Sequence, residues 1–138
     1  MAKYVIKTPQ ITVNGVDLSS YLEDVTLTYE ADEIESTSSG TTVNDKSFVA
    51  GLRSWSVDAT LHQDYAASQV DATLFPLVGA DPFTILLKPT SAAVGAGNPS
   101  FSGSAILLSY PPMTGKVGEL AKVTIKFRGT GALTRATS

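Results

Sequence analysis

The sequence of 138 residues contains no cysteine and a single histidine, His62. Without cysteine, disulfide bonds and thiolate metal sites are excluded, so the core alone must hold the fold. His62 stands at the polar end of an alternating segment, and no second histidine or cysteine can complete a metal site with it. We therefore interpret His62 as a surface residue and expect neither a metal nor another cofactor.

Long apolar runs are also missing. No window approaches the ~18 apolar residues that mark a membrane-spanning helix. The N-terminal stretch from Met1 to Ile6 lacks the apolar core of a signal peptide. We expect a single domain, residues 1–138, that is made in a cytoplasm and does not bind membranes.

Charge is sparse, because charged residues make up 17% of the chain, with 10 basic residues against 13 acidic ones. No dense basic cluster is present to neutralise phosphates, so tight binding to nucleic acid is not expected. The surface of a free domain commonly carries about 25–35% charged residues. The low fraction here predicts that partner proteins cover much of the surface.

The charges that are present are separated by sign. One tract is acidic and contains Glu23, Asp24, Glu30, Asp32, Glu33 and Glu35. The C-terminal part is basic apart from Glu119, with Lys116, Lys122, Lys126, Arg128 and Arg135. Separated opposite charges favour ordered contacts between proteins, including copies of one chain.

No set of residues predicts catalysis or calcium binding. Glu23 and Asp24 are adjacent, so on a strand their carboxylates would point to opposite faces and make a poor glycosidase pair. The acidic tract lacks the ligand spacing and central glycine of an EF-hand loop. No Gly-x-Ser-x-Gly motif occurs, and residues 95–97 lack the helix and lysine of a phosphate-binding loop. We expect a protein that is not an enzyme.

Alternation of apolar and polar residues is the dominant pattern, in segments 25–30, 55–62 and 122–128. It is typical of antiparallel strands with one face on the core, and it points Trp55 and Phe127 inward. Segments 83–87 and 101–108 are apolar enough to be central strands. Asn14-Gly15, between two short apolar runs, predicts a tight hairpin. The sequence therefore predicts a mainly β, antiparallel fold.

Three segments depart from this pattern. Residues 66–75, which precede Pro76, predict one short helix with Val70 and Leu74 on its apolar face. Residues 36–49 read as a long polar loop and residues 129–138 as a small polar tail. Neither has enough apolar side chains to offset its ordering entropy, so we expect a neighbouring subunit to hold each of them.

A series of short motifs runs through the chain. It comprises 13–19 (Val-Asn-Gly-Val-Asp-Leu-Ser), 31–35 (Ala-Asp-Glu-Ile-Glu), 51–57 (Gly-Leu-Arg-Ser-Trp-Ser-Val), 61–65 (Leu-His-Gln-Asp-Tyr), 70–77 (Val-Asp-Ala-Thr-Leu-Phe-Pro-Leu), 88–92 (Lys-Pro-Thr-Ser-Ala) and 131–136 (Gly-Ala-Leu-Thr-Arg-Ala). In this order the series resembles the tail tube, or major tail, proteins of long-tailed phages, in the variety common among phages of actinobacteria. The resemblance covers nearly the whole chain.

The resemblance implies a β-sandwich or half-barrel with one flanking helix. Six copies would close a ring, and stacked rings would form a hollow tube through which DNA passes without specific binding. Partners would be copies of the chain and the tape measure, tail terminator and tail-tip proteins of a virion.

The resemblance also suggests which residues make the contacts. The long loop would reach the adjacent ring through Ser36, Thr37, Gly40, Val43, Asp45, Lys46 and Phe48. An acidic lumen would repel DNA, and the candidates for it are Asp24, Glu30, Asp32, Glu33 and Glu35. A C-terminal arm would reach a neighbour through Leu133 and Arg135. We expect Arg53 and Arg128 to meet carboxylates across a subunit boundary.

Other functions share the lack of catalytic residues. A capsid decoration protein or a tail-tip β module would form trimers or bind a capsid lattice without stacking, and would not need the long polar loop. A carbohydrate-binding module would display aromatic side chains on a flat face, whereas Trp55 and Phe127 are predicted to point inward. An enzyme is the least favoured class.

Overall fold

The computed structural model describes residues 3–38 and 44–138. In these ranges the elements are β1 (Gln10–Val13), β2 (Val16–Asp17), a 3-10 turn (Ser19–Tyr21), β3 (Leu22–Glu35), β4 (Phe48–His62), α1 (Val70–Leu74), a second 3-10 turn (Phe75–Leu77), β5 (Phe83–Lys88), β6 (Ser100–Leu107) and β7 (Lys122–Ala136). The seven strands form one antiparallel sheet in the order β2-β1-β5-β6-β7-β4-β3. The predicted mainly β, antiparallel fold with one short helix is confirmed.

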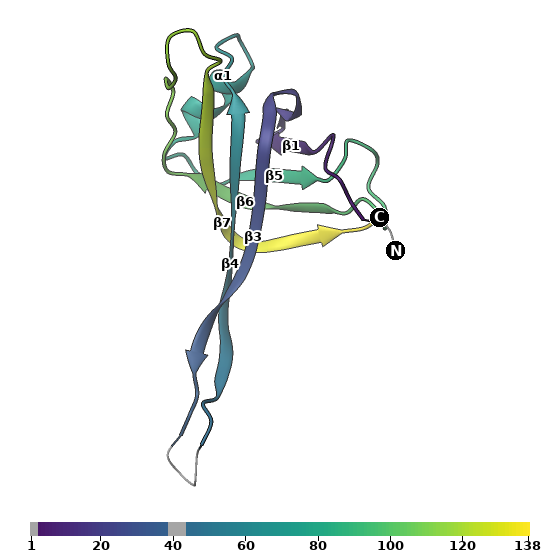
Figure 1. Cartoon of the computed structure of the whole chain (residues 1–138), viewed down its shortest axis with the longest axis vertical. Coiled ribbons are helices and arrows are strands. Elements are labelled where there is room, and N and C mark those ends of the chain that lie inside the picture. The colour runs from purple at the N-terminus through teal and green to yellow at the C-terminus, as the bar shows by residue number, and fades with distance from the viewer. Residues whose placement is uncertain (1–2, 39–43) are drawn as a thin grey trace.

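The sheet bends over itself into two layers. In Figure 1, β3, β4 and the first half of β7 stand upright, while β1, β5, β6 and the second half of β7 run across them. β7 belongs to both layers, because residues 122–128 pair with β4 and its later residues pair with β6. Gly131 lies in this second half with φ of 87°, a conformation that residues with a Cβ rarely adopt.

The core lies between the two layers. Seven inward side chains from β4 and β7 are at most 2% exposed: Trp55, Val57, Ala59, Leu61, Val123, Ile125 and Phe127. The ring of Phe127 meets the ring of Phe83 on β5 edge to face, with centroids 5.8 Å apart. Fully burying a side chain of this kind contributes about 1.5–3 kcal/mol. The predicted inward orientation of Trp55 and Phe127 is confirmed.

The first hairpin follows its sequence signal. Val13 pairs with Val16, which leaves Asn14 and Gly15 as a two-residue turn. Their φ angles are 50° and 83°. Positive φ at both positions is what a type I′ turn requires, and Asn-Gly is the pair that tolerates it best.

The helix is shorter than the sequence predicts. The pattern indicates residues 66–75, whereas α1 covers Val70–Leu74 and is followed by the 3-10 turn Phe75–Leu77. Ser68 has a φ of 63°, which is left-handed and incompatible with a right-handed helix. Pro76 lacks the N–H that an α-helix would need there. In the described ranges no helix is long and apolar enough to cross a membrane.

The C-terminal segment also differs from the prediction. Residues 129–136 are the second half of β7 and not a polar arm, because Ser102 pairs with Thr134, Phe101 with Arg135 and Ser100 with Ala136. The bend of β7 brings these residues onto β6, so the chain's own sheet pairs the backbone groups along one edge of this segment. The expectation that a neighbouring subunit orders this segment is therefore wrong for residues 129–136.

Candidate assembly surfaces

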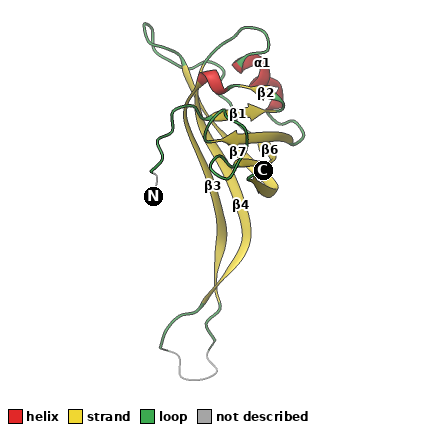
Figure 2. Cartoon of the chain, turned by 90° about the vertical axis from the view of Figure 1, so that its right-hand side faces the viewer, coloured by secondary structure: helices red, strands yellow, loops and turns green. Residues whose placement is uncertain are grey.

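The most prominent surface feature is a hairpin that leaves the two-layer body. β3 and β4 continue beyond the body as a two-stranded ribbon along the longest axis of the molecule (Figures 1 and 2). Ile34 pairs with Val49 and Glu35 with Phe48, and the amide of Ser36 donates to the carbonyl of Ser47 at 2.8 Å. We call the described residues 31–38 and 44–53 the projecting hairpin.

The projecting hairpin exposes apolar side chains at a place where it has no core of its own. Ile34, Phe48 and Val49 are each about half exposed, and Leu52 is 83% exposed. A two-stranded ribbon without further packing is marginally stable in water. These side chains are therefore available to pack against another surface.

The residues predicted to contact an adjacent ring lie on this hairpin. Ser36, Thr37, Asp45 and Lys46 are exposed in the segment 36–47, since β3 ends at Glu35. The Lys46 ammonium is 3.9 Å from the Glu35 carboxylate, and both side chains are more than half exposed, so solvent screens the pair. Phe48, predicted as a loop residue, begins β4, and Val49 follows it in the strand. Gly40 and Val43 lie outside the described residues.

The five acidic candidates do not share one face. Asp24 pairs with Thr60 and Glu30 with Ser54, which places both carboxylates on the polar face of the upright layer. Because side chains alternate along a strand, Glu33 and Glu35 point to the opposite side of β3. Asp32 lies where the register with β4 shifts. These residues are close in the sequence, but the pleat of β3 points their side chains to different faces of the strand.

On the polar face of the upright layer, the sign of the charged side chains changes from acidic on β3 to basic on β7. Asp24 and Glu30 are on the edge strand β3, Asp58 is on β4, and Lys126 and Arg128 are on β7. The register places Asp58 directly beside Lys126. All five residues are exposed. One side of this face is therefore acidic and the other basic.

At the rim of this face, one carboxylate contacts two basic side chains. Glu23 lies 3.0 Å from the Lys122 ammonium and 3.3 Å from Nε2 of His62. The hydrogen bond from Lys122 lowers the pKa of Glu23 below its ordinary value. The side chain of His62 is 40% exposed, in line with its interpretation as a surface residue.

The two arginines predicted at subunit boundaries lie on different faces. Arg128 is on the polar face opposite Ser56. The Arg53 guanidinium donates to the hydroxyl of Tyr29 at 3.1 Å, on the other side of β4. They would therefore serve two separate contacts.

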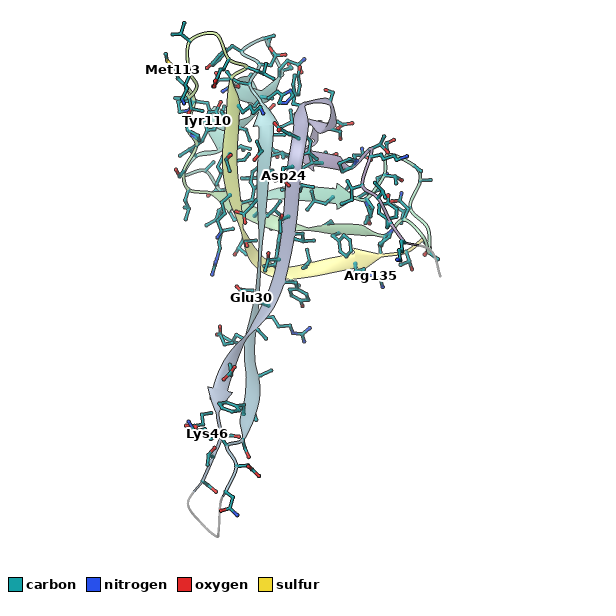
Figure 3. All side chains as sticks on the ribbon, viewed as in Figure 1. Asp24, Glu30, Lys46, Tyr110, Met113 and Arg135 are labelled. Atoms are coloured by element: carbon teal, nitrogen blue, oxygen red, sulfur yellow. The ribbon has the colours of Figure 1, made fainter. Side chains whose placement is uncertain are left out.

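The two residues predicted for a C-terminal arm are part of the body. Leu133 is partly buried and packs against the core, and Arg135 pairs with Phe101 across β6 and β7. Figure 3 places Arg135 on the second half of β7, away from the projecting hairpin.

Two free strand edges could not be read from the sequence. Among the described strands, β3 pairs with β4 alone, so its other edge is open over its 14 residues. β7 loses β4 as a partner beyond Arg128, which opens one edge of its second half. Open edges present unpaired backbone groups and pair readily with other strands. Strand order, which sequence alternation does not reveal, creates both edges.

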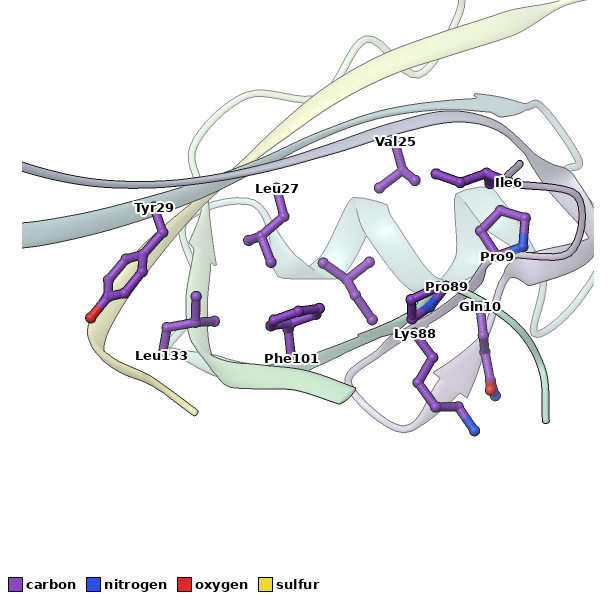
Figure 4. A pocket seen from close by; sticks show the side chains of 11 residues that line it. Ile6, Pro9, Gln10, Val25, Leu27, Tyr29, Lys88, Pro89, Phe101 and Leu133 are labelled. Atoms are coloured by element: carbon purple, nitrogen blue, oxygen red, sulfur yellow. The ribbon is translucent and has the colours of Figure 1, made fainter. Parts of the chain in front are cut away.

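An apolar groove of about 350 Å³ lies between β3 and the crossing layer (Figure 4). It is lined by Ile6, Pro9, Gln10, Val25, Leu27, Tyr29, Leu87, Lys88, Pro89, Phe101 and Leu133. The alternation of Val25, Leu27 and Tyr29 is its sequence signal. The groove shows that the two layers are not fully closed at the β3 edge. Among the described residues, no group of three or more acidic or histidine side chains could hold a metal ion.

No family model matches the chain, and no curated protein is significantly similar to it in sequence. Solved structures nevertheless share its fold. A chain from the virion of a native gene transfer agent particle aligns with a TM-score of 0.74 at 14% identity, over 97% of this chain and 99% of that one. A chain from the tail of an empty gene transfer agent particle with C6 symmetry gives 0.66 at 14% identity, over 84% and 82%.

A third solved structure comes from a different type of particle. The sheath/tube terminator of an extracellular contractile injection system, in its extended state, aligns with a TM-score of 0.70 at 14% identity, over 99% of this chain and 98% of that one. The chain therefore has the fold found in these virion, tail and terminator structures.

Proposed function

We propose that this chain is the structural subunit of a phage-type tail tube. Copies close into rings, six to a ring, and the rings stack into a hollow tube through which DNA passes without specific binding. The chain acts in the virion tail and carries out no catalysis. Its partners are copies of itself and the proteins that start, fill and end the tube: the tail-tip, tape measure and tail terminator proteins.

The observation that carries this proposal is the projecting hairpin. It extends along the longest axis of the molecule and exposes Phe48, Val49 and Leu52 without covering them. A contact made along that axis does not close on itself, so it adds copies in one direction and builds a filament. The shared fold with a tail chain of C6 symmetry supports a ring as the repeating layer of this filament.

The free strand edges support ring closure. In a ring, the open edge of β3 faces the next copy, and pairing there removes an aggregation-prone surface. The acidic side of the polar face lies at this edge, and the basic side lies on β7. Opposite charges at the two sides of the polar face favour a head-to-tail contact over a symmetric one.

The similarity to a sheath/tube terminator favours one second candidate. A terminator would form a single ring that caps a tube and would not stack on itself. On a capping ring the projecting hairpin would be covered if it pointed toward the tube and uncovered if it pointed away, whereas in a stack every internal hairpin is covered.

The test is negative-stain electron microscopy of the purified chain over a series of concentrations, with sedimentation velocity on the same samples. Hollow tubes with six-fold end views are the expected result. Isolated rings that never stack would favour the terminator. A chain that stays monomeric at every concentration would contradict self-assembly.

A further inference from the structure

The end of the molecule opposite the projecting hairpin is also unusually apolar. Residues 108–121, which we call the end loop, connect β6 to β7. Figure 3 places Met113 of this loop and Lys46 of the hairpin at opposite ends of the longest axis. The two segments therefore form the two ends of an elongated subunit.

The apolar side chains of the end loop lie in solvent. Leu108 is 68% exposed, Met113 89% and Leu120 62%, and Val117 is fully exposed. Singly exposed apolar residues are ordinary, but several on one short loop mark a contact surface. Both ends of the molecule therefore expose several apolar side chains.

Hydrogen bonds hold the end loop in place. The carbonyl of Pro112 accepts from the Tyr65 hydroxyl at 2.7 Å and from Nε2 of Gln63 at 3.0 Å. The amide of Gln63 donates to the carbonyl of Ala121 at 3.0 Å. Tyr110, next to Pro111, accepts from Gln63 at 2.8 Å and donates to Asp71 at 2.9 Å. The loop is thus anchored at both ends while its apolar side chains stay exposed, which lowers the entropy cost of binding a partner.

The end loop borders a hollow that could receive part of a projecting hairpin. A hollow of about 640 Å³ is lined by Thr114, Gly115, Lys116, Glu119, Leu120 and Lys122. Its charged side chains are Lys116, Glu119 and Lys122, and Lys122 already pairs with Glu23 at 3.0 Å. The projecting hairpin carries more acid than base, with Asp32, Glu33, Glu35 and Asp45 against Lys46 and Arg53. Exposed Lys116 is therefore the cation of the end loop that a hairpin carboxylate can approach.

We propose that the end loop of one copy receives the projecting hairpin of a second copy in the next ring. This inference rests on the proposed function and names the surface that the hairpin contacts. Leu52 would pack against Met113, Val117 and Leu120, together with Phe48 or Val49, which point to opposite faces of the hairpin. Hairpin carboxylates would lie near Lys116. Each copy then contacts the next ring on one side through its projecting hairpin and on the other side through its end loop. All copies point the same way along the tube.

The absence of cysteine permits a direct test by cross-linking. Leu52→Cys and Val117→Cys variants are mixed in equal amounts, assembled and treated with a short bismaleimide. Each replaced side chain is more than four-fifths exposed, so neither change disturbs the core. A Leu52→Cys and Ala93→Cys mixture is the matched control, because residue 93 is exposed in the loop between β5 and β6.

The expected result is a covalent dimer of the two different variants, at least tenfold more abundant than in the control mixture. Tubes in the microscope without this cross-link would overturn the inference and leave the proposed function standing. Dimers of Leu52→Cys with itself would also overturn it, since they require contact between two projecting hairpins. If neither tubes nor cross-links form, both the inference and the proposed function are overturned.

A second variant tests the same surface without cross-linking. Val117→Asp places a carboxylate in the receiving surface, and we expect at least a tenfold higher protein concentration for tube formation. Val5→Asp is the control, because Val5 is 70% exposed and belongs to neither the projecting hairpin nor the end loop. An unchanged circular dichroism spectrum verifies the fold of both variants. Equal assembly of the two would count against the inference.

Discussion

The indole N–H of Trp55 donates a hydrogen bond to the carbonyl oxygen of Gly131 at 3.2 Å. This contact joins β4 of the upright layer to the second half of β7 in the crossing layer. The indole ring lies so close to the bend that a Cβ on Gly129 would be 2.2 Å from its atoms. Trp55 therefore fills the corner where one sheet becomes two layers, and the absence of a side chain at residue 129 makes room for it.

A Gly129→Ala substitution should destabilise the fold by about 1–3 kcal/mol, because the added methyl group overpacks the corner and displaces the indole. Urea unfolding followed by the fluorescence of Trp55, the single tryptophan, measures this change. The control is Gly97→Ala, where an added Cβ would contact no atom within 4 Å. Equal stability of the two variants would show that the bend tolerates a side chain.

A Gly15→Ala substitution tests the first hairpin. Gly15 has a φ of 83°, and an added Cβ would meet no atom within 4 Å, so the cost arises from backbone conformation and not from packing. We expect a loss of about 1 kcal/mol, within the range for a non-glycine residue in the left-handed region. The same urea titration measures it, and a neutral result would exclude a type I′ turn in solution.

Tyr110 should make the fold sensitive to high pH. Burial raises its pKa to about 12, and its hydrogen bond to Asp71 acts in the same direction, whereas the bond from Gln63 opposes it. In the unfolded chain a tyrosine titrates near pH ~10. Between these values the unfolded state loses a proton that the folded state keeps, so stability should fall as pH rises from about 10 to about 12.

The Tyr110→Phe variant separates this effect from general alkaline unfolding. At neutral pH it should lose about 1–2 kcal/mol, because Asp71 and Gln63 lose their shared partner. Above pH ~10 its stability should fall less steeply than that of the wild type. Tyr4→Phe, which removes an exposed hydroxyl, should follow the wild-type curve. Parallel curves for all three proteins would rule out Tyr110 as the titrating group.

The hairpin tip should be needed for stacking and not for folding. Because Glu35 and Phe48 are a cross-strand pair, residues 36–47 can be replaced by Asn-Gly, which closes β3 and β4 with a two-residue turn. We expect a folded subunit whose urea midpoint is nearly unchanged and which forms no tubes. Tubes of normal length would contradict the role proposed for the hairpin.

Charge reversal of Arg128 should weaken assembly more than folding. Arg128 is exposed on the basic side of the polar face, where it would meet a carboxylate of the next copy. Arg128→Glu should therefore raise the protein concentration needed for assembly several-fold and leave the urea midpoint nearly unchanged. Lys7→Glu, on the exposed N-terminal segment, is the matched control. Assembly of both variants at the wild-type concentration would remove Arg128 from the interface.

Much of the fold could be predicted because local patterns agree with the final structure. Alternation located the part of β4 from Trp55 to His62 and the first half of β7. Asn14-Gly15 located a turn that requires positive φ. The second half of β7 was missed because most of its own residues are small or polar. Its pairing with β6 depends on the bend of β7 near Gly129, against which the distant Trp55 packs. Such a long-range contact leaves no periodic signal in the sequence.

The candidate surfaces were harder to predict for the same reason. The sequence singled out residues 36–49 as a contact element, and the structure shows that the flanking strands project from the body. It grouped Asp24 with Glu33, which the pleat of β3 places on opposite sides. The open edge of β3 and the end loop depend on strand order and on side-chain exposure. Neither property can be read from composition or spacing.

The continuity of β4 has a mechanical consequence. One 15-residue strand runs from the hairpin into the core, where it lies between β3 and β7. A pull applied at the tip along the long axis would load the hydrogen bonds to both neighbours in shear. Many bonds must then break together, whereas a pull at right angles would open them one after another. Tension along a stack of such subunits would therefore act on each of them in its most resistant direction.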